Sequence, residues 1–124
     1  MYFINKIGNK NFTLLGQLMQ MHSKAHKVIA GNIANANTPY YRRQEFKFDT
    51  ALREALSGGT SAHYSDIRGY TERPRNTPVR NNGNDVDMDM EMLKLRSNSG
   101  SYNMYAQFYQ QKSAMVKEAI RGGR

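Results

Sequence analysis

Apolar residues recur near the start of the chain at alternating steps of four and three, which places them on one face of a helix. The positions are Leu14, Leu18, Met21, Ala25 and Val28, and the polar Asn32 occupies the next position of the same spacing. We predict an amphipathic helix over residues 12–34, preceded by a loose polar segment. The helix is expected to stop at residues 35–39, because Asn tolerates the left-handed conformation and the residue before a proline disfavours the helical one.

The same spacing returns in the last third of the chain and predicts a second long helix within residues 85–121, starting near residue 87. Its positions are Met88, Met92, Leu95, Ser99, Tyr102, Ala106, Tyr109, Ser113, Val116 and Ile120. The residues expected to widen this stripe are Met104, Phe108 and Met115. Acidic residues at its start are favourable against the positive end of the helix macrodipole. These residues are Asp85, Asp87, Asp89 and Glu91.

Residues 35–84 lack a sustained period and are predicted to be largely irregular. Phe46 and Phe48 alternate as in an extended segment, and Asp49 is placed to cap a short helix. The pair Asn82-Gly83 is typical of hairpin turns. We therefore expect a short helix and a hairpin inside an otherwise irregular middle segment.

The predicted fold class is mainly α, with two long amphipathic terminal helices, antiparallel and coiled-coil-like, in one domain over residues 1–124. A chain of 124 residues with 39% hydrophobic residues has a thin core. Two helices cannot enclose all of their apolar surface, and exposed apolar stripes mark interaction surfaces. We therefore expect an assembly interface. Its residues are Leu14, Leu18, Met21, Ala25, Val28, Met92, Leu95, Tyr102, Ala106, Tyr109, Val116 and Ile120.

Basic residues outnumber acidic ones, giving a formal net charge of +8 and a sequence pI of about 9.9. This balance leaves two alternatives open: a basic nucleic-acid-binding module and an amphipathic protein of membrane surfaces. Arginines interleaved with aromatic residues, as in Tyr40-Tyr41-Arg42-Arg43, suit stacking and phosphate contacts. Because no known nucleic-acid-binding motif accompanies them, direct binding to nucleic acid is disfavoured.

Candidate sites for metal ions and catalysis are weak. His22 and His26 are four residues apart, as zinc ligands on a helix are, but a third ligand is missing nearby. The acids between Asp85 and Glu91 lack the glycine and glutamate positions of a calcium loop. The sequence has no cysteine and shows no catalytic triad or phosphate-binding loop. We therefore predict no catalytic residue, no metal and no cofactor, and do not expect an enzyme.

The segment that ends the first predicted helix carries a specific motif, Asn32-Ile33-Ala34-Asn35-Ala36-Asn37-Thr38-Pro39. It resembles the N-terminal signature of flagellar axial proteins, in which an apolar helix runs into an Asn-Ile-Ala-Asn-x-x-Thr-Pro-Gly-Tyr type sequence. Here Tyr40 replaces the glycine that the family places after the proline. Because tyrosine resists a positive φ, we expect a type I turn or an extended segment at this position.

A second motif, Gly83-Asn84-Asp85-Val86-Asp87-Met88-Asp89-Met90-Glu91, precedes the long C-terminal helix. It is similar to the corresponding segment of proximal rod proteins of the FlgB type. The resemblance implies that motif residues include Val86, Asp87, Asp89 and Glu91 alongside the N-terminal ones. It also implies a structural subunit of the bacterial flagellar basal-body rod that polymerises through its terminal helices and serves motility.

The resemblance further implies a location in the periplasmic rod of the basal body and partners in its assembly. These partners would be other rod subunits, basal-body ring and rod-adapter proteins, and the flagellar type III export apparatus. The first residues lack the pattern of a cleavable signal peptide, and no stretch is apolar enough to cross a bilayer. Both observations agree with export through the flagellar apparatus.

Overall fold

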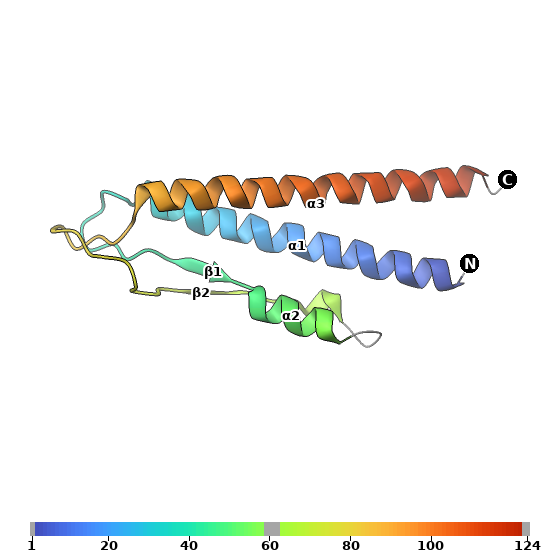
Figure 1. Cartoon of the computed structure of the whole chain (residues 1–124), viewed down its shortest axis with the longest axis horizontal. Coiled ribbons are helices and arrows are strands. Elements are labelled where there is room, and N and C mark those ends of the chain that lie inside the picture. The colour runs from blue at the N-terminus through green and yellow to red at the C-terminus, as the bar shows by residue number, and fades with distance from the viewer. Residues whose placement is uncertain (1, 59–62, 123–124) are drawn as a thin grey trace.

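The two long terminal helices lie side by side and antiparallel in the computed structural model, which describes residues 2–58 and 63–122 (Figure 1). Helix α1 spans Tyr2–Ala34 and helix α3 spans Met88–Gly122. The prediction of a loose start before residue 12 is wrong. The segment contains no proline, and its single Gly8 lowers helix propensity without stopping the helix.

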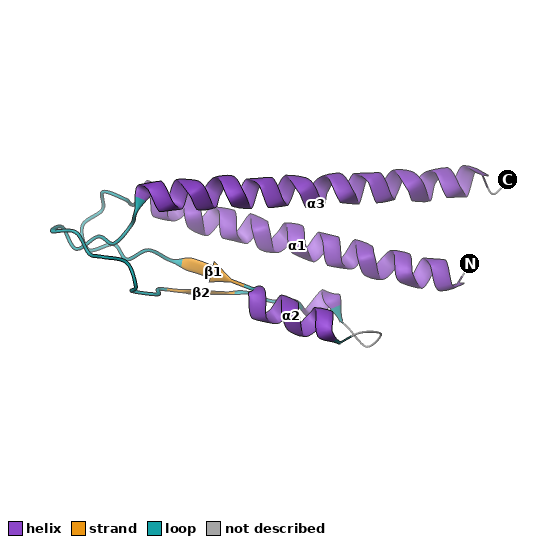
Figure 2. Ribbon diagram, viewed as in Figure 1, coloured by secondary structure: helices purple, strands orange, loops and turns teal. Residues whose placement is uncertain are grey.

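The middle of the chain forms an arm beside the helix pair (Figure 2). Its elements are β1 (Glu45–Lys47), α2 (Asp49–Ser57), the 3-10 helix η2 (Tyr64–Asp66) and β2 (Tyr70–Glu72). The two strands pair antiparallel with Phe46 opposite Thr71, and Lys47 Nζ lies 2.8 Å from Glu72 Oε1. The extended segment and the short helix of the sequence prediction are thereby confirmed.

Two local details of the middle segment differ from the prediction. Asp49 lies in the first turn of α2 rather than capping it, because Phe48 occupies the N-cap position and makes no side-chain cap bond. The two paired strands are β1, which precedes α2 in the chain, and β2, which follows it. Asn82-Gly83 forms only a tight turn, in which the Gly83 amide donates to the Arg80 carbonyl oxygen at 2.9 Å. The predicted location of the hairpin is therefore wrong.

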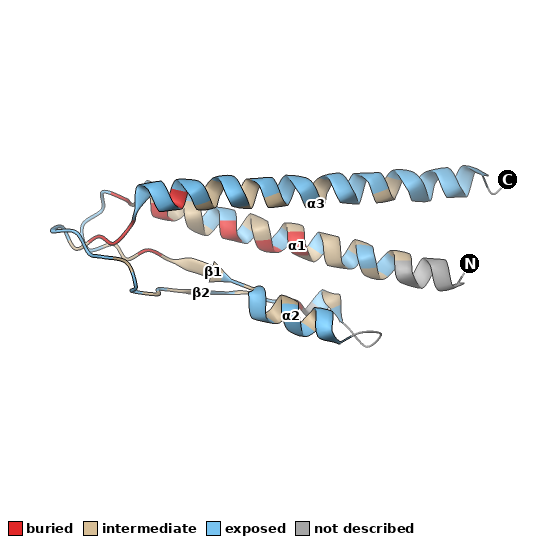
Figure 3. Ribbon diagram, viewed as in Figure 1, coloured by how far each residue is buried: buried red, intermediate tan, exposed pale blue. Residues whose placement is uncertain are grey.

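Helix α1 is the central element of the fold, because α3 packs along it and the arm packs on it through β1 and η2. Ile67, directly after η2, is buried, and the ring of Phe48 meets the ring of His22 edge-on at 5.2 Å between centroids. In contrast, α3 has α1 as its principal neighbour and is exposed over most of its length (Figure 3). One of the two terminal helices is thus covered on several sides and the other is not.

The apolar core of the described residues is small, as the composition predicted. Its buried members are Leu18, Met21, Ala25, Ala36, Ile67 and Val86. Five further buried side chains are polar or charged: Asn32, Arg43, Asn84, Asp85 and Glu91. They lie toward the loop end of the helix pair, far from the two termini (Figure 3).

Candidate functional site

The two sequence motifs meet at the loop end of the helix pair, around a group of buried polar side chains that we call the tip cluster. It consists of Asn32, Arg43, Asn84, Asp85 and Glu91, each at most 3% exposed. Burying polar groups is unfavourable unless each finds a hydrogen-bond partner. Nearly all of the buried polar atoms of the tip cluster have such a partner; the exceptions are Asp85 Oδ2 and Glu91 Oε1.

Asn32, near the end of α1, bonds to several different parts of the tip cluster and its surroundings. Its Nδ2 donates to the Gln44 carbonyl oxygen at 2.7 Å and to Glu91 Oε2 at 3.1 Å. Its Oδ1 accepts from the Gln44 amide at 2.9 Å and from the Tyr41 hydroxyl at 3.1 Å. The amide therefore makes four hydrogen bonds, the usual capacity of an Asn side chain. They join α1, the segment after it and α3 at one point.

Asn84 makes the corresponding connection from the other motif. Its Nδ2 donates to the carbonyl oxygens of Asn35, at 2.8 Å, and Thr38, at 2.9 Å. Its Oδ1 accepts from the Val86 amide at 2.8 Å. The backbone that leaves α1 is thus bonded to the backbone that enters α3.

Arg43 supplies the positive charge of the tip cluster. Its guanidinium donates to Thr77 Oγ1 and Asn76 Oδ1, both at 2.7 Å, and to Glu45 Oε2 at 3.3 Å. Its Nη1 also lies 3.9 Å from Glu91 Oε1. Hydrogen bonds to three side chains, one of them the Glu45 carboxylate, and the nearby Glu91 carboxylate compensate the loss of hydration of this buried charge.

The two buried carboxylates are each held by a hydrogen bond and by a nearby arginine. Asp85 Oδ1 accepts from the Arg43 amide at 2.6 Å, and its Oδ2 faces Arg42 Nη1 at 3.6 Å. Asp85 Oδ2 and Glu91 Oε1 have no hydrogen-bond donor, so their arginine neighbours provide the compensation. The sequence assigned both acids to the second motif and gave them the role of charges at a helix start, whereas Asp85 precedes α3 and Glu91 points into the tip cluster.

Burial, assisted by the charges of Glu91 and Asp85, raises the pKa of the Tyr41 phenol above its ordinary value, against the lowering effect of Arg73. The phenol therefore stays protonated at neutral pH. It can then donate to Asn32, as the hydrogen bond between them requires.

Tyr40 adopts a φ of 61°, so the expectation of a type I or extended geometry is wrong. The Tyr41 amide donates to the Thr38 carbonyl oxygen at 3.3 Å across this turn, with Pro39 second and Tyr40 third. Positive φ at the third position is the mark of a type II turn. The Tyr40 amide also donates to the Asn82 carbonyl oxygen at 2.9 Å, which helps to hold the tyrosine in a backbone region that it disfavours.

Other motif residues end one helix and start the other. Asn35 Nδ2 donates to the Gly31 carbonyl oxygen at 2.8 Å, and Asp87 Oδ1 accepts from the Met90 amide at 3.1 Å in the first turn of α3. Val86 is buried. The remaining motif residues contribute less internally: Ile33 is half-buried, and Ala34, Asn37, Thr38, Pro39 and Asp89 are exposed.

Large apolar side chains on the outward side of α3 form a second candidate site, which we call the outer face. Its members are Met90, Leu93, Met104, Phe108 and Met115, which are 39–72% exposed. Leu93, Met104 and Met115 follow each other at intervals of eleven residues, about three helical turns, and so share one side of the helix. Met104, Phe108 and Met115 were predicted to widen the apolar stripe of this helix, and all three are exposed in the single chain.

The side of α3 that meets α1 is unexpectedly polar. Glu91 bonds to Asn32, Asn98 bonds to His22, and the Tyr105 ring lies 5.5 Å from the His22 ring. Closer to the termini, Phe12 and Tyr109 meet edge-on at 5.0 Å. The contact between the two helices therefore includes several polar side chains of α3, while the apolar residues of the outer face stay exposed.

The residues expected to form an assembly interface fall into three groups. Leu18, Met21 and Ala25 are buried within the single chain. The half-buried residues are Leu14, Val28, Leu95 and Ala106. The exposed ones are Met92, Tyr102, Tyr109, Val116 and Ile120. All of the exposed members belong to α3, and among the side chains described in α1, residues 8–34, no large apolar one is exposed.

Several functional residues were not singled out by sequence reasoning. Arg43 was grouped with the arginines that, interleaved with aromatic residues, suit phosphate contacts, and the role of Asn84 was not anticipated. One sequence feature pointed to these residues: an Asn-rich motif and an Asn-Asp motif occur in the same chain, and each adjoins the end of a predicted helix. Their mutual bonds span 42 to 59 residues of sequence, as in Arg43 with Asp85 and Asn32 with Glu91, and no local pattern shows such contacts.

Within residues 2–58 and 63–122, no group of three or more His, Cys, Asp or Glu side chains is arranged to hold a metal ion. No helix in this part of the chain has the length and apolar character needed to span a bilayer.

Comparison with known proteins found relatives of one kind. The chain is 30% identical to the flagellar basal body rod protein FlgB of Aeromonas hydrophila, over 92% of this chain and 95% of that protein. It is 28% identical to FlgB of Borreliella burgdorferi, over 77% of this chain and 87% of the relative. It is 29% identical to FlgB of Aquifex aeolicus, over 80% of this chain and 83% of that protein. No protein-family model matches the chain.

Proposed function

The chain belongs to the FlgB family of flagellar basal body rod proteins, and on that premise we propose that it joins the rod chiefly through the outer face of α3. Membership makes it a structural subunit of the proximal rod, located in the flagellar basal body and serving motility rather than catalysis. The family also implies assembly with other rod components.

The observation that carries the proposal is the unequal covering of the two terminal helices. Helix α1 is covered by α3 and by the arm, whereas the outer face of α3 exposes Leu93 at 67% and Met115 at 72%. Large apolar side chains in contiguous exposed stripes mark interaction surfaces. Each such side chain stabilises an assembly by roughly 1.5–3 kcal/mol when it becomes fully buried.

The tip cluster has a different role in this proposal. By bonding Asn32 to Glu91 and Asn84 to the end of α1, it fixes where the two helices meet. The outer face is then presented on a helix whose position relative to α1 is set before assembly. Preorganisation of this kind lowers the entropy lost on association.

A neighbouring subunit would meet the outer face with a different surface, because its α1 and its arm present other residues. A contact between unlike surfaces produces a helical polymer when its rotation does not close into a ring. We propose rod subunits as the immediate neighbours. We further propose the basal-body ring and rod-adapter proteins and the flagellar export apparatus as partners at the ends of assembly and during export, on the strength of the family alone.

The test is incorporation of a triple variant, Leu93→Glu, Met104→Glu and Met115→Glu, into basal bodies of a strain that lacks its own copy of the chain. We expect loss of incorporation and of swimming, with the thermal midpoint of the purified variant close to that of the unmodified chain. The matched control is Gln110→Glu, which adds charge at an exposed polar position of α3. Normal incorporation of the triple variant would overturn the proposal.

A further inference from the structure

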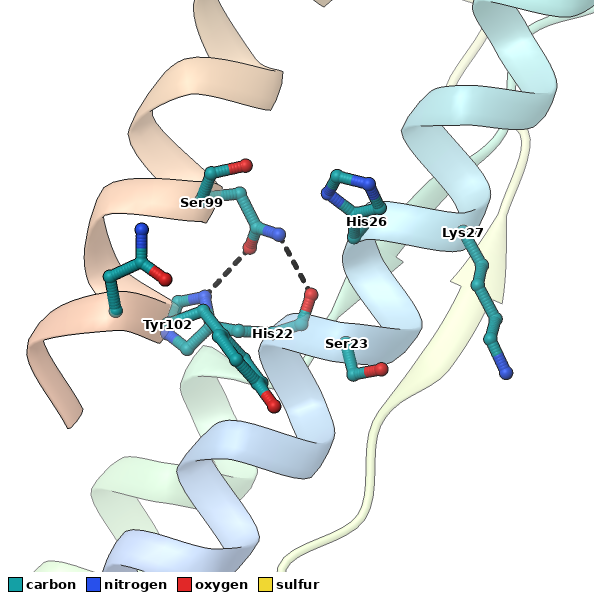
Figure 4. Close-up of a pocket in the computed structure, with 8 residues that line it drawn as sticks. His22, Ser23, His26, Lys27, Ser99 and Tyr102 are labelled. Atoms are coloured by element: carbon teal, nitrogen blue, oxygen red, sulfur yellow. Dashed lines mark hydrogen bonds between the residues drawn. The ribbon is translucent and has the colours of Figure 1, made fainter. Parts of the chain in front are cut away.

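A polar groove lies between α1 and α3 in the middle of the helix pair (Figure 4). It encloses about 400 Å³, and its lining includes His22, His26 and Lys27 from α1 and Asn98, Ser99 and Tyr102 from α3. We call it the midhelix groove. Neither the family motifs nor the outer face account for it.

The floor of the midhelix groove is fixed by one side chain. Asn98 Nδ2 donates to the His22 carbonyl oxygen at 2.7 Å, so its Oδ1 faces the imidazole, 2.7 Å from Nδ1 (Figure 4). A carbonyl oxygen can only accept, so Nδ1 must carry the hydrogen. The His22 ring is also held between the rings of Phe48 and Tyr105. The groove is therefore a formed feature with a rigid base.

The rim of the groove offers hydrogen-bond donors that the described part of the chain does not use. The side chains of His26, Lys27, Ser99 and Tyr102 take part in no hydrogen bond or ion pair there. The lining carries a lysine and two histidines and no carboxylate. The Lys27 ammonium extends from the rim along the outer side of α1, away from α3 (Figure 4). A donor-rich hollow with an exposed lysine at its rim and no carboxylate in its lining is complementary to a carboxylate.

We propose that the midhelix groove receives the acidic first turn of α3 from a second copy of this chain, with Asp89 meeting Lys27. Exposed carboxylates are otherwise scattered over the described residues, at Asp49, Glu54 and Glu118. Asp87 and Asp89 stand two residues apart, and exposed Met88 and Met90 beside them add apolar contact area. This turn is the densest negative surface that a second copy presents.

A groove cannot take this turn from its own chain. Asp89 precedes Ser99 by ten residues on the same straight helix, which is about 15 Å along its axis. The contact must therefore join two copies through unlike surfaces, and each copy keeps one groove and one acidic turn for further neighbours. Such contacts generate open polymers when their rotation does not close into a ring. The inference rests on the proposed rod function and names one contact within it.

The experiment uses charge reversal in the purified full chain, with self-association measured by sedimentation velocity at low ionic strength. We expect Lys27→Glu and Asp89→Lys each to weaken self-association about fivefold, as surface ion pairs of this kind do. An equimolar mixture of the two variants should restore association to within about twofold of the unmodified chain, because the reversed charges again match. Rising ionic strength should weaken the unmodified contact.

Lys24→Glu and Glu118→Lys serve as matched controls, because they reverse exposed charges on the same helices outside the groove and outside the first turn of α3. Both should associate like the unmodified chain. The inference is overturned if either test variant associates normally, if the mixture fails to recover, or if the unmodified chain stays monomeric up to about 1 mM. None of these outcomes bears on the outer-face variants, whose incorporation into basal bodies tests the proposed function separately.

Discussion

Asn32 Nδ2 donates to Glu91 Oε2 across 3.1 Å, and this bond joins the last turns of α1 to the first turn of α3. The two residues are 59 positions apart in sequence, and both are at most 1% exposed. The pair shows why the two motifs at the ends of the middle segment occur together. Each supplies half of a buried network that neither could satisfy alone.

Replacing Asn32 with leucine tests this network. Asn32→Leu removes four hydrogen bonds and leaves the Gln44 backbone and the Glu91 carboxylate without their partner. Because unsatisfied buried polar groups are expensive, we expect a loss of about 3 kcal/mol in the free energy of unfolding. Urea denaturation followed by circular dichroism measures it. Asn37→Leu, at an exposed motif position, should stay within about 0.5 kcal/mol, and equal effects of the two would contradict the role of Asn32.

Gly83→Ala probes the turn beneath Tyr40. Gly83 has a φ of 81°, and an added Cβ would lie 2.6 Å from Tyr40 Cδ1 and 3.2 Å from Tyr40 Cα. We expect a loss of about 2 kcal/mol, from the left-handed backbone and the close contacts together. In a Tyr40→Gly background the ring contact is gone, and the loss should fall toward about 1 kcal/mol.

A thermal or urea denaturation cycle over the four chains measures that coupling. Gly16→Ala is the control, because a Cβ there meets nothing within 4 Å and the position is helical. It should stabilise the chain by up to about 1 kcal/mol. Additive effects of Gly83→Ala and Tyr40→Gly would show that the tyrosine ring does not constrain the glycine.

Tyr41 gives a prediction for alkaline pH. Burial raises the pKa of this phenol in the folded chain above its ordinary value of 10.0. Its contribution to stability is therefore complete below about pH 10 and is lost as the pH rises through the folded-state pKa. Tyr41→Phe should lower stability at neutral pH by loss of the bond to Asn32 and should reduce the decline above pH 10. Parallel stability curves of the two chains at alkaline pH would contradict this assignment.

The helices were predictable because their signals are local. The four-three spacing from Leu14 to Val28 and the Asn-rich stop at its end are read within one segment, and α1 ends at Ala34 as expected. The same spacing could not show which side of α3 meets α1. Leu93, Met104 and Met115 form their own eleven-residue series, and a helix with apolar residues on two sides leaves the inward side undecided.

The tip cluster and the arm could not be predicted because they depend on contacts between distant residues. Arg43 looks like any solvated arginine until Thr77, Asn76 and Glu45 are brought around it. The pairing of Phe46 with Thr71 requires that the chain return past α2. The positive φ of Tyr40 is held partly by the Asn82 carbonyl oxygen, which lies more than forty residues later in the sequence. In each case the tertiary contact overrides the local preference.

Gly100 offers a way to separate folding from assembly. It lies between Leu93 and Met104 on the outward side of α3, is exposed, and a Cβ there meets nothing within 4 Å. Gly100→Ala should therefore raise the free energy of unfolding by about 1 kcal/mol and leave incorporation unchanged. Gly100→Trp should leave the isolated chain at least as stable as the unmodified one, because tryptophan has a higher helix propensity than glycine.

In the rod, by contrast, the indole of Gly100→Trp would stand in the middle of the outer face and keep a neighbour from approaching. We expect incorporation into basal bodies to fall severalfold, measured by quantitative immunoblotting, while the melting temperature does not fall. The alanine variant is the matched control for the loss of glycine flexibility. Incorporation of the tryptophan variant at the level of the alanine variant would mean that neighbouring subunits pack elsewhere than on the outer face.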